Sequence, residues 1–140
     1  MLKLYLQELK RRKNQNKLEL LDSKFKQQAA FVEDQSTFIA ACTTRRAGKS
    51  SGLAYKFFRA GLKFNNVILP YIALTRNSAE NIMWPVLKEI AVKEGIECSF
   101  LDSDLSCKLQ NGSVIKLFGA DMKNFIQRLG GIKTPFAALS

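Results

Sequence analysis

The sequence contains no histidine and only three cysteines, and each shortage excludes some kinds of chemistry. Without histidine the chain can form neither a Ser-His triad nor a His-ligated metal site, and it has no His general base. Cys42, Cys98 and Cys107 are odd in number and include no C-x-x-C pair, so we expect neither a disulfide framework nor a zinc cluster. Reduced thiols of this kind indicate a cytoplasmic protein.

Long apolar runs are also absent. The longest, from Val67 to Leu74, has eight residues and contains Pro70, whereas a helix that spans a bilayer needs about 20. The N-terminal stretch MLKLYLQELKRRK carries charges throughout and lacks the uninterrupted apolar core of a secretory signal. The sequence therefore predicts a protein without a membrane partner.

Negative charge is scarce relative to positive charge. The 140 residues include 22 Lys and Arg against 12 Asp and Glu, which gives a net charge of +10. Such an excess attracts polyanions, nucleic acid first among them, although a solvated lysine-rich surface gives the same count. The length is that of about one domain, and the apolar content of 46% predicts a globular chain.

The beginning of the chain differs in pattern from the rest. Residues 1–24 read as a basic helical arm, in which Leu2, Leu6 and Leu9 recur at helical spacing. The remainder, residues 25–140, reads as strands and helices in alternation, which is typical of an α/β fold.

Two apolar runs predict the first strands. TFIAACTT (37–44) has no helical polarity and predicts a strand buried on both faces, and a helix is expected over residues 49–64. NVILPYIALT (66–75) predicts the second buried strand. Its Pro70 indicates an interrupted ladder or a position near the sheet edge.

A longer helix and a hairpin follow. Asn77 begins the predicted helix, with Glu80 completing a capping box, and Gly95 ends it. Pro85 falls inside and is expected to kink or split it. Further on, the sequence predicts strands at 97–101, 105–109 and 113–120, a hairpin turn at Asn111-Gly112, and a short helix at 122–129.

The stretch CTTRRAGKSSG (42–52) lies between the first predicted strand and the first predicted helix, the context that a phosphate-binding loop requires. Gly48 allows close backbone approach, and the helix that opens at Lys49 offers unpaired N–H groups and a partial positive charge. The Lys49 ammonium can reach the β- and γ-phosphates of a nucleotide. The Ser50 hydroxyl suits the Mg²⁺ ion that bridges them.

This motif leaves an alternative open. A glycine is missing five residues before Gly48, where Thr43 stands, so the stretch could be a basic helix start with Ser50 as an ordinary surface residue. Arg45 could stabilise charge that develops on a transferring phosphate. Equally, Arg45 and Arg46 could pair with acidic groups elsewhere in the chain.

The stretch AACTTRRAGKSSG resembles the Walker A loop of large terminase subunits, the ATPase motors that package DNA into the heads of tailed bacteriophages. Those loops commonly carry an arginine three residues before the glycine, as Arg45 stands here, and often relax the first glycine. Three more segments match the family in order, and the resemblance covers roughly residues 25–140. These segments are KQQAAFVEDQSTFIAA, YIALTRNSAENIMWPVLKEI and LQNGSVIKLFGADMKNFIQRLGG.

The resemblance implies a fold and a site. The fold is α/β, with an incomplete P-loop NTPase sheet of the ASCE type, flanking helices and a β-hairpin. Arg45 would be a catalytic arginine, and Gln28 and Phe31 would contact the adenine of ATP, although Phe31 could equally be a core residue. Ser50 would bind Mg²⁺. The nucleotide-binding residues implied are Thr43, Thr44, Arg45, Arg46, Ala47, Gly48, Lys49, Ser50, Ser51, Gln28 and Phe31.

Two features of the family are missing. Its Walker B strand ends in adjacent acids that hold Mg²⁺ and activate water, and no such pair follows an apolar run here. FAALS (136–140) stands where that strand would begin, so we expect residues 25–140 to bind nucleotide while hydrolysis belongs to a longer parent. In this fold class another strand separates the loop strand from the Walker B strand. Strands without neighbours leave polar backbone groups unpaired, so we expect marginal stability. The family also usually has arginine before glycine where Gly130-Gly131 stands here.

The resemblance implies double-stranded DNA as the object moved, with a portal protein, a small terminase subunit and further copies of the chain in a ring as partners. The location would be the cytoplasm of a phage-infected or prophage-carrying bacterium. Two alternatives stay open, a helicase-like DNA-dependent ATPase and a basic nucleic-acid-binding module without a nucleotide site. An RNase-H-like nuclease domain after the motor would distinguish a terminase from a helicase.

Overall fold

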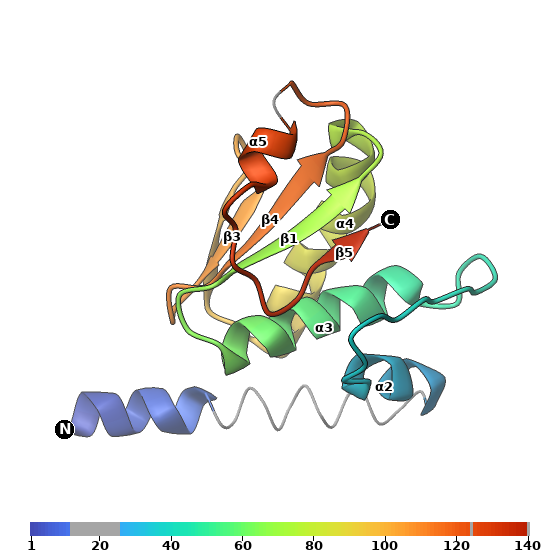
Figure 1. Cartoon of the computed structure of the whole chain (residues 1–140). Coiled ribbons are helices and arrows are strands. Elements are labelled where there is room, and N and C mark those ends of the chain that lie inside the picture. The colour runs from blue at the N-terminus through green and yellow to red at the C-terminus, as the bar shows by residue number, and fades with distance from the viewer. Residues whose placement is uncertain (12–25, 124, 140) are drawn as a thin grey trace.

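The computed structural model describes residues 1–11, 26–123 and 125–139 (Figure 1). Residues 2–11 are helical, as expected for the basic arm, and the rest of that predicted arm lies outside the described residues. No helix in the described ranges combines the length and the apolarity needed to cross a bilayer.

One mixed sheet of five strands forms the centre of the fold, in the order β2-β3-β4-β1-β5. Its strands are β1 (Ile68–Ala73), β2 (Cys98–Leu101), β3 (Ser106–Leu109), β4 (Val114–Gly119) and β5 (Ala138–Leu139). β1 runs parallel to both β4 and β5, whereas β2, β3 and β4 form an antiparallel meander. The fold is therefore α/β with a hairpin appended, as the sequence predicts.

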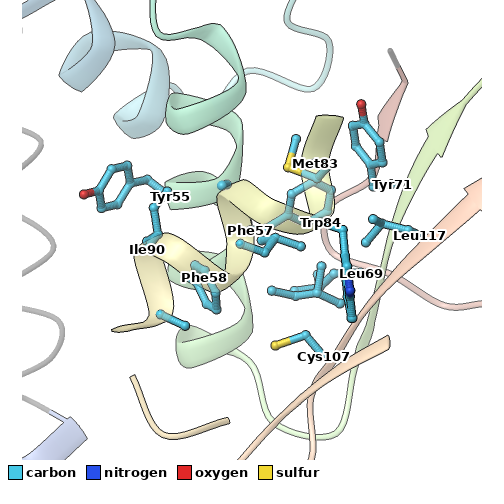
Figure 2. Close-up of a cluster of buried hydrophobic side chains, with 14 of the residues drawn as sticks. Tyr55, Phe57, Phe58, Leu69, Tyr71, Met83, Trp84, Ile90, Cys107 and Leu117 are labelled. Atoms are coloured by element: carbon cyan, nitrogen blue, oxygen red, sulfur yellow. The ribbon is translucent and has the colours of Figure 1, made fainter. Parts of the chain in front are cut away.

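The helices are α2 (Lys26–Glu33), α3 (Lys49–Lys63), α4 (Arg76–Glu94) and α5 (Phe125–Leu129). α3 and α4 pack against each other and both contact β1 and β4. Figure 2 shows Phe57 and Phe58 of α3 gathered with Leu69 of β1 and Cys107 of β3, all fully buried. Burial of such large apolar side chains is the main stabilising contribution to the fold.

The hairpin turn fixes the far end of α3. Asn111 Nδ2 donates to Gly61 O at 2.6 Å and to Phe64 O at 3.1 Å, which satisfies carbonyls that the helix end leaves unpaired. Gly112 adopts the left-handed backbone, φ 85°, that a tight hairpin turn requires. The predicted hairpin at Asn111-Gly112 and the predicted helix after Gly48 are thus confirmed. The hydrogen bonds of Asn111 join the hairpin turn to the end of this helix.

The predicted strand at 37–44 is wrong. In the described part of the chain these residues pair with no strand and make no backbone–backbone hydrogen bond. They are exposed except for half-buried Ile39, and the Phe38 side chain is 93% exposed. An apolar run forms a buried strand only where a neighbour bonds its N–H and C=O groups. β1 already has β4 on one side and β5 on the other, so it offers this run no free edge at Tyr71 and Ile72.

The capping prediction for the long helix is also wrong. α4 begins one residue earlier, at Arg76, and its N-cap is Thr75, whose hydroxyl accepts a hydrogen bond from Ser78 N at 3.0 Å. Thr75 has the extended backbone of an N-cap residue, whereas Asn77 lies inside the first turn. The end of the helix is as predicted, since Gly95 is a left-handed C-cap with φ 62°.

Two prolines fall inside predicted elements. Pro85 does not split the helix in two, because α4 continues through it with Trp84 before it and Leu87 after it buried in the same core. Pro70 lies near the sheet edge, as predicted, because β1 is the neighbour of the edge strand β5. β5 pairs only with Tyr71 and Ile72, so on that side of β1 the missing N–H of Pro70 leaves no hydrogen bond of the ladder unmade.

Candidate functional site

Residues 45–48 form the turn that leads into α3. Arg46 and Gly48 both have left-handed backbones, with φ of 63° and 76°. Left-handed residues in tight turns are the conformation from which anion-binding concavities of successive N–H groups are built. Glycine at position 48 meets two requirements at once. Its φ is positive, and a Cβ there would lie 3.2 Å from Gln28 Nε2.

The first N–H groups of α3 have no acceptor among the residues that the structure describes. The first one with a backbone acceptor belongs to Gly52, which donates to Gly48 O at 2.9 Å. For Lys49, Ser50 and Ser51, the described residues supply no acceptor, and Gly48 provides no side-chain cap. The first turn of α3 contains no acidic residue, so the partial positive charge of its N-terminus is not neutralised locally.

Three cationic side chains stand around this turn. Arg45, Arg46 and Lys49 are exposed, and none of them forms an ion pair with a carboxylate of the described ranges. The alternative in which Arg45 and Arg46 pair with acids elsewhere therefore finds no support there. Thr43 and Thr44 precede the turn in an exposed segment without hydrogen-bonded neighbours, so the structure does not organise them into the site.

α2 brings the two predicted base-contacting residues to the turn. Gln28 Nε2 donates to Gly48 O at 3.0 Å. A Cβ on Gly52, one helical turn into α3, would lie 3.2 Å from Gln28 Cγ and 3.4 Å from Phe31 Cδ1. Gln28 and Phe31 thus lie on the face of α3 that starts at the phosphate-loop candidate, although 20 residues separate Gln28 from Gly48 in the sequence.

A buried lysine beneath α2 was missed by the sequence analysis. Lys56 is only 8% exposed, and its Nζ donates to the carbonyls of Phe31 at 2.9 Å and Asp34 at 2.6 Å. Burial lowers the pKa of the Lys56 ammonium, and the carboxylate of Asp34 partly offsets this. The four-residue spacing of Gly48, Gly52 and Lys56 places them on one helix face, and that spacing could have indicated the position.

Two aspartates, Asp102 and Asp121, accept hydrogen bonds from residues outside the turn. Asp102 accepts hydrogen bonds from Lys88 Nζ and Trp84 Nε1, both at 2.7 Å, and these bonds lower the pKa of its carboxyl. Asp121 accepts from Arg76 N at 3.0 Å. No group of three His, Cys, Asp or Glu residues within the described ranges could hold a metal ion. The Ser50 hydroxyl, half-buried and without a hydrogen-bond partner there, suits the hard oxygen coordination of Mg²⁺ as one ligand among several.

The turn lies at the edge of the sheet where ligands of α/β proteins bind. Only residues 64–67 connect α3 to β1, and Figure 1 shows β1 running back against the direction of α3. The start of α3 is therefore on the side where the parallel strands β1, β4 and β5 end. Ligands in open α/β sheets bind beyond these carboxyl ends.

Comparison with solved structures finds the same fold in a protein of known role. The large terminase from a thermophilic bacteriophage superimposes with a TM-score of 0.64 at 15% sequence identity, over 81% of this chain. This chain has a terminase-like fold. The match spans 31% of the length of that terminase. No family model matches the sequence, and the search of curated proteins finds no similar one.

Proposed function

We propose that this chain is the nucleotide-binding part of a terminase-like motor that packages phage DNA. The observation that carries the proposal is the turn at 45–48 within a terminase-like fold. Two left-handed residues of this turn lead into α3, and the first three N–H groups of α3 have no acceptor among the described residues. Such a helix start binds polyphosphate because its N–H groups and its dipole both favour negative charge.

Each residue of the site has a distinct task in this proposal. The N–H groups of Lys49, Ser50 and Ser51 bind phosphate oxygens, and the Lys49 ammonium neutralises the β- and γ-phosphates. Bound Mg²⁺ would screen charge between the phosphates, with the Ser50 hydroxyl as its ligand from this chain. Arg45 is the candidate to stabilise charge that develops on the γ-phosphate.

In this proposal α2 supplies the residues that contact the adenine base of ATP. Gln28 and Phe31 supply an amide and an aromatic ring next to the phosphate turn, and these are the groups that would recognise a purine by hydrogen bonding and packing. Residues 1–140 contain no acid pair of the kind that activates water in this family, so the activity proposed for them is ATP binding rather than hydrolysis.

The net charge of +10 supports double-stranded DNA as the object moved. In the proposal, further copies of the chain, a portal protein and a small terminase subunit are partners of the full motor. A helicase-like ATPase would share the nucleotide site but prefer single-stranded DNA. Competition between duplex and single-stranded oligonucleotides of equal charge therefore tests the choice of motor.

Calorimetric titration with Mg²⁺-ATP tests the nucleotide site itself. Lys49→Ala removes the phosphate-binding ammonium and should weaken ATP binding about tenfold or more. Lys93→Ala is the matched control, because Lys93 is exposed in the last turn of α4 and its loss changes the net charge equally. Equal ATP affinity of the two variants would contradict the proposal. Wild-type protein that binds DNA but no ATP would instead support the basic nucleic-acid-binding module.

A further inference from the structure

One face of α3 contacts residues of α2. Gly48, Gly52 and Lys56 follow one another at four-residue spacing along it. The two glycines admit the Gln28 and Phe31 side chains at contact distance, and Lys56 lies beneath the end of α2. The same helix face therefore carries the phosphate turn at one end and the support of α2 two turns further on.

The Lys56 ammonium acts as a C-terminal cap of α2, supplied by another helix. Its Nζ donates to Phe31 O at 2.9 Å and Asp34 O at 2.6 Å, with Val32 O at 3.5 Å. The last carbonyls of a helix have no intrahelical partner and attract positive charge. α2 has no basic residue in its own last turn, so this role falls to Lys56.

Two aromatic rings flank the same ammonium. Lys56 Nζ lies 5.2 Å from the centroid of the Phe31 ring and 5.8 Å from that of Phe136. Phe136 in turn packs edge-to-face on Phe57, with centroids 5.0 Å apart. Lys56 thereby ties α2 to the segment that leads into β5 as well as to its own helix.

Apart from Lys56, α2 is held mainly by two apolar side chains, Val32 in the core and Phe31 packed against it. It has eight residues, and Val32 is its one buried side chain among those described. A helix this short gains little stability from its own hydrogen bonds, so its position depends on tertiary contacts. The contacts at its far end, Gln28 against Gly48 and Gly52, are small ones.

We propose that Lys56 is a positioning residue for base recognition, because it fixes α2 on α3 and so sets where Gln28 and Phe31 stand relative to the phosphate turn. This inference rests on the proposed function, since it assigns the base side of the same site. It separates two parts of that site. The start of α3 binds the phosphates. Recognition of the base depends on Lys56, because Lys56 holds α2 in place and α2 carries Gln28 and Phe31.

The separation predicts a selective defect. Lys56→Met keeps the length of the side chain and removes its charge and donors. We expect it to weaken binding of Mg²⁺-ATP about tenfold while Mg²⁺-tripolyphosphate, which has no base, binds within about twofold of wild type. Lys56→Arg should retain most of the ATP affinity. Lys93→Met is the control for charge. Equal loss for the two ligands, or no loss for either, would overturn the proposal.

Gly52→Ala should also displace α2 from α3, and it leaves the charge of Lys56 unchanged. Its new methyl group meets Gln28 and Phe31 and should displace α2, while alanine strengthens α3 as a helix. The expected result is again weaker ATP binding with tripolyphosphate binding kept. This variant decides the question if Lys56→Met does not fold, and loss of tripolyphosphate binding in Gly52→Ala would count against the inference.

Hydrogen exchange separates a failure of this inference from a failure of the proposed function. Amides of residues 26–34 should exchange about fivefold faster in Lys56→Met than in wild type or Lys93→Met, with no ligand present. Unchanged exchange would show that Lys56 does not hold α2. If wild type binds neither ATP nor tripolyphosphate, the proposed function fails, and the exchange rates still show whether Lys56 positions α2.

Discussion

Two short apolar runs of this chain, residues 37–44 and strand β1, both read as buried strands in the sequence but have opposite environments. β1 lies between β4 and β5, and its Leu69 and Tyr71 side chains are buried. Residues 37–44 have no neighbouring strand in the described part of the chain and are largely exposed. A neighbouring strand that bonds the backbone groups, more than the apolar residues of the segment, decides whether a strand forms. The turn at residues 45–48 lies between two regions, residues 37–44, called the open half below, and the residues from α3 to β5, called the packed half.

The largest expected effect contrasts two phenylalanines from these two regions. Phe57→Ala removes a fully buried ring from the packed half and should cost about 3–5 kcal/mol of unfolding free energy. Phe38→Ala, at a side chain that is 93% exposed, should change it by less than about 0.5 kcal/mol. Urea unfolding followed by circular dichroism gives both values. A cost at Phe38 comparable to that at Phe57 would mean that residues 37–44 are packed in solution.

The next contrast is between Gly119 at the end of β4 and Gly48 in the turn before α3. Gly119→Ala would place a Cβ 2.7 Å from Arg76 Cα and against the Arg76 backbone nitrogen, where rigid backbone cannot yield, at a cost of about 2–3 kcal/mol. Gly48→Ala meets mainly a positive φ and should cost about 1 kcal/mol. Thermal unfolding ranks the two. Gly48→Ala alone should also weaken tripolyphosphate binding, and the reverse pattern would refute the assignment of the turn.

Acid should reveal a smaller difference between two aspartates. Hydrogen bonds from Lys88 and Trp84 lower the pKa of Asp102, and those from Ser36 lower the pKa of Asp34. A lowered pKa stabilises the fold above the ordinary value of 3.8 and the contribution is lost as pH falls through the folded-state pKa. Stability should thus decline below about pH 4.

The decline should be flatter in Asp102→Asn than in Asp34→Asn, because the Asp102 carboxylate links the β2–β3 turn to α4 whereas the Asp34 carboxylate accepts its hydrogen bond from nearby Ser36. Urea midpoints at pH 6 and pH 3 measure it. If both variants keep the full acid sensitivity of wild type, neither hydrogen-bonded carboxylate contributes in solution.

Thiol labelling gives the subtlest contrast. Cys42 is exposed in the open half, whereas Cys107 is buried in β3 and its pKa is raised by its hydrogen bond with Cys98 and by burial. Because the thiolate is the reactive form, Ellman's reagent should modify Cys42 about a hundredfold faster than Cys107. Mass spectrometry of quenched samples identifies the labelled residue. Labelling of Cys42 as slow as that of Cys107 would indicate that residues 37–44 form a strand paired within the sheet.

Local signals in the sequence predicted much of the packed half. Gly95 ends α4 and Gly112 allows the hairpin turn because both positions require a left-handed residue, and glycine in the sequence indicates such positions. The N-cap at Thr75 and the continuation of α4 through Pro85 depend on tertiary packing, which no local pattern contains.

The candidate site likewise has features that the sequence predicted and one that it did not. The turn before Lys49 and its free N–H groups follow from the motif. The approach of Gln28 and Phe31 to the turn was anticipated through the family resemblance, while their roles stay predictions. Lys56 was not anticipated, because a lysine in an amphipathic helix normally lies in water and only the approach of α2 makes it a cap.

The central claim, that the start of α3 grips polyphosphate, is tested most directly by NMR titration of the ¹⁵N-labelled chain with Mg²⁺-tripolyphosphate. The account predicts saturable shifts in the amide resonances of Gly48, Lys49, Ser50 and Ser51 that are larger than those elsewhere in the chain and are lost in Lys49→Ala. Shifts spread over the basic surface, with these four amides unmoved, would contradict it.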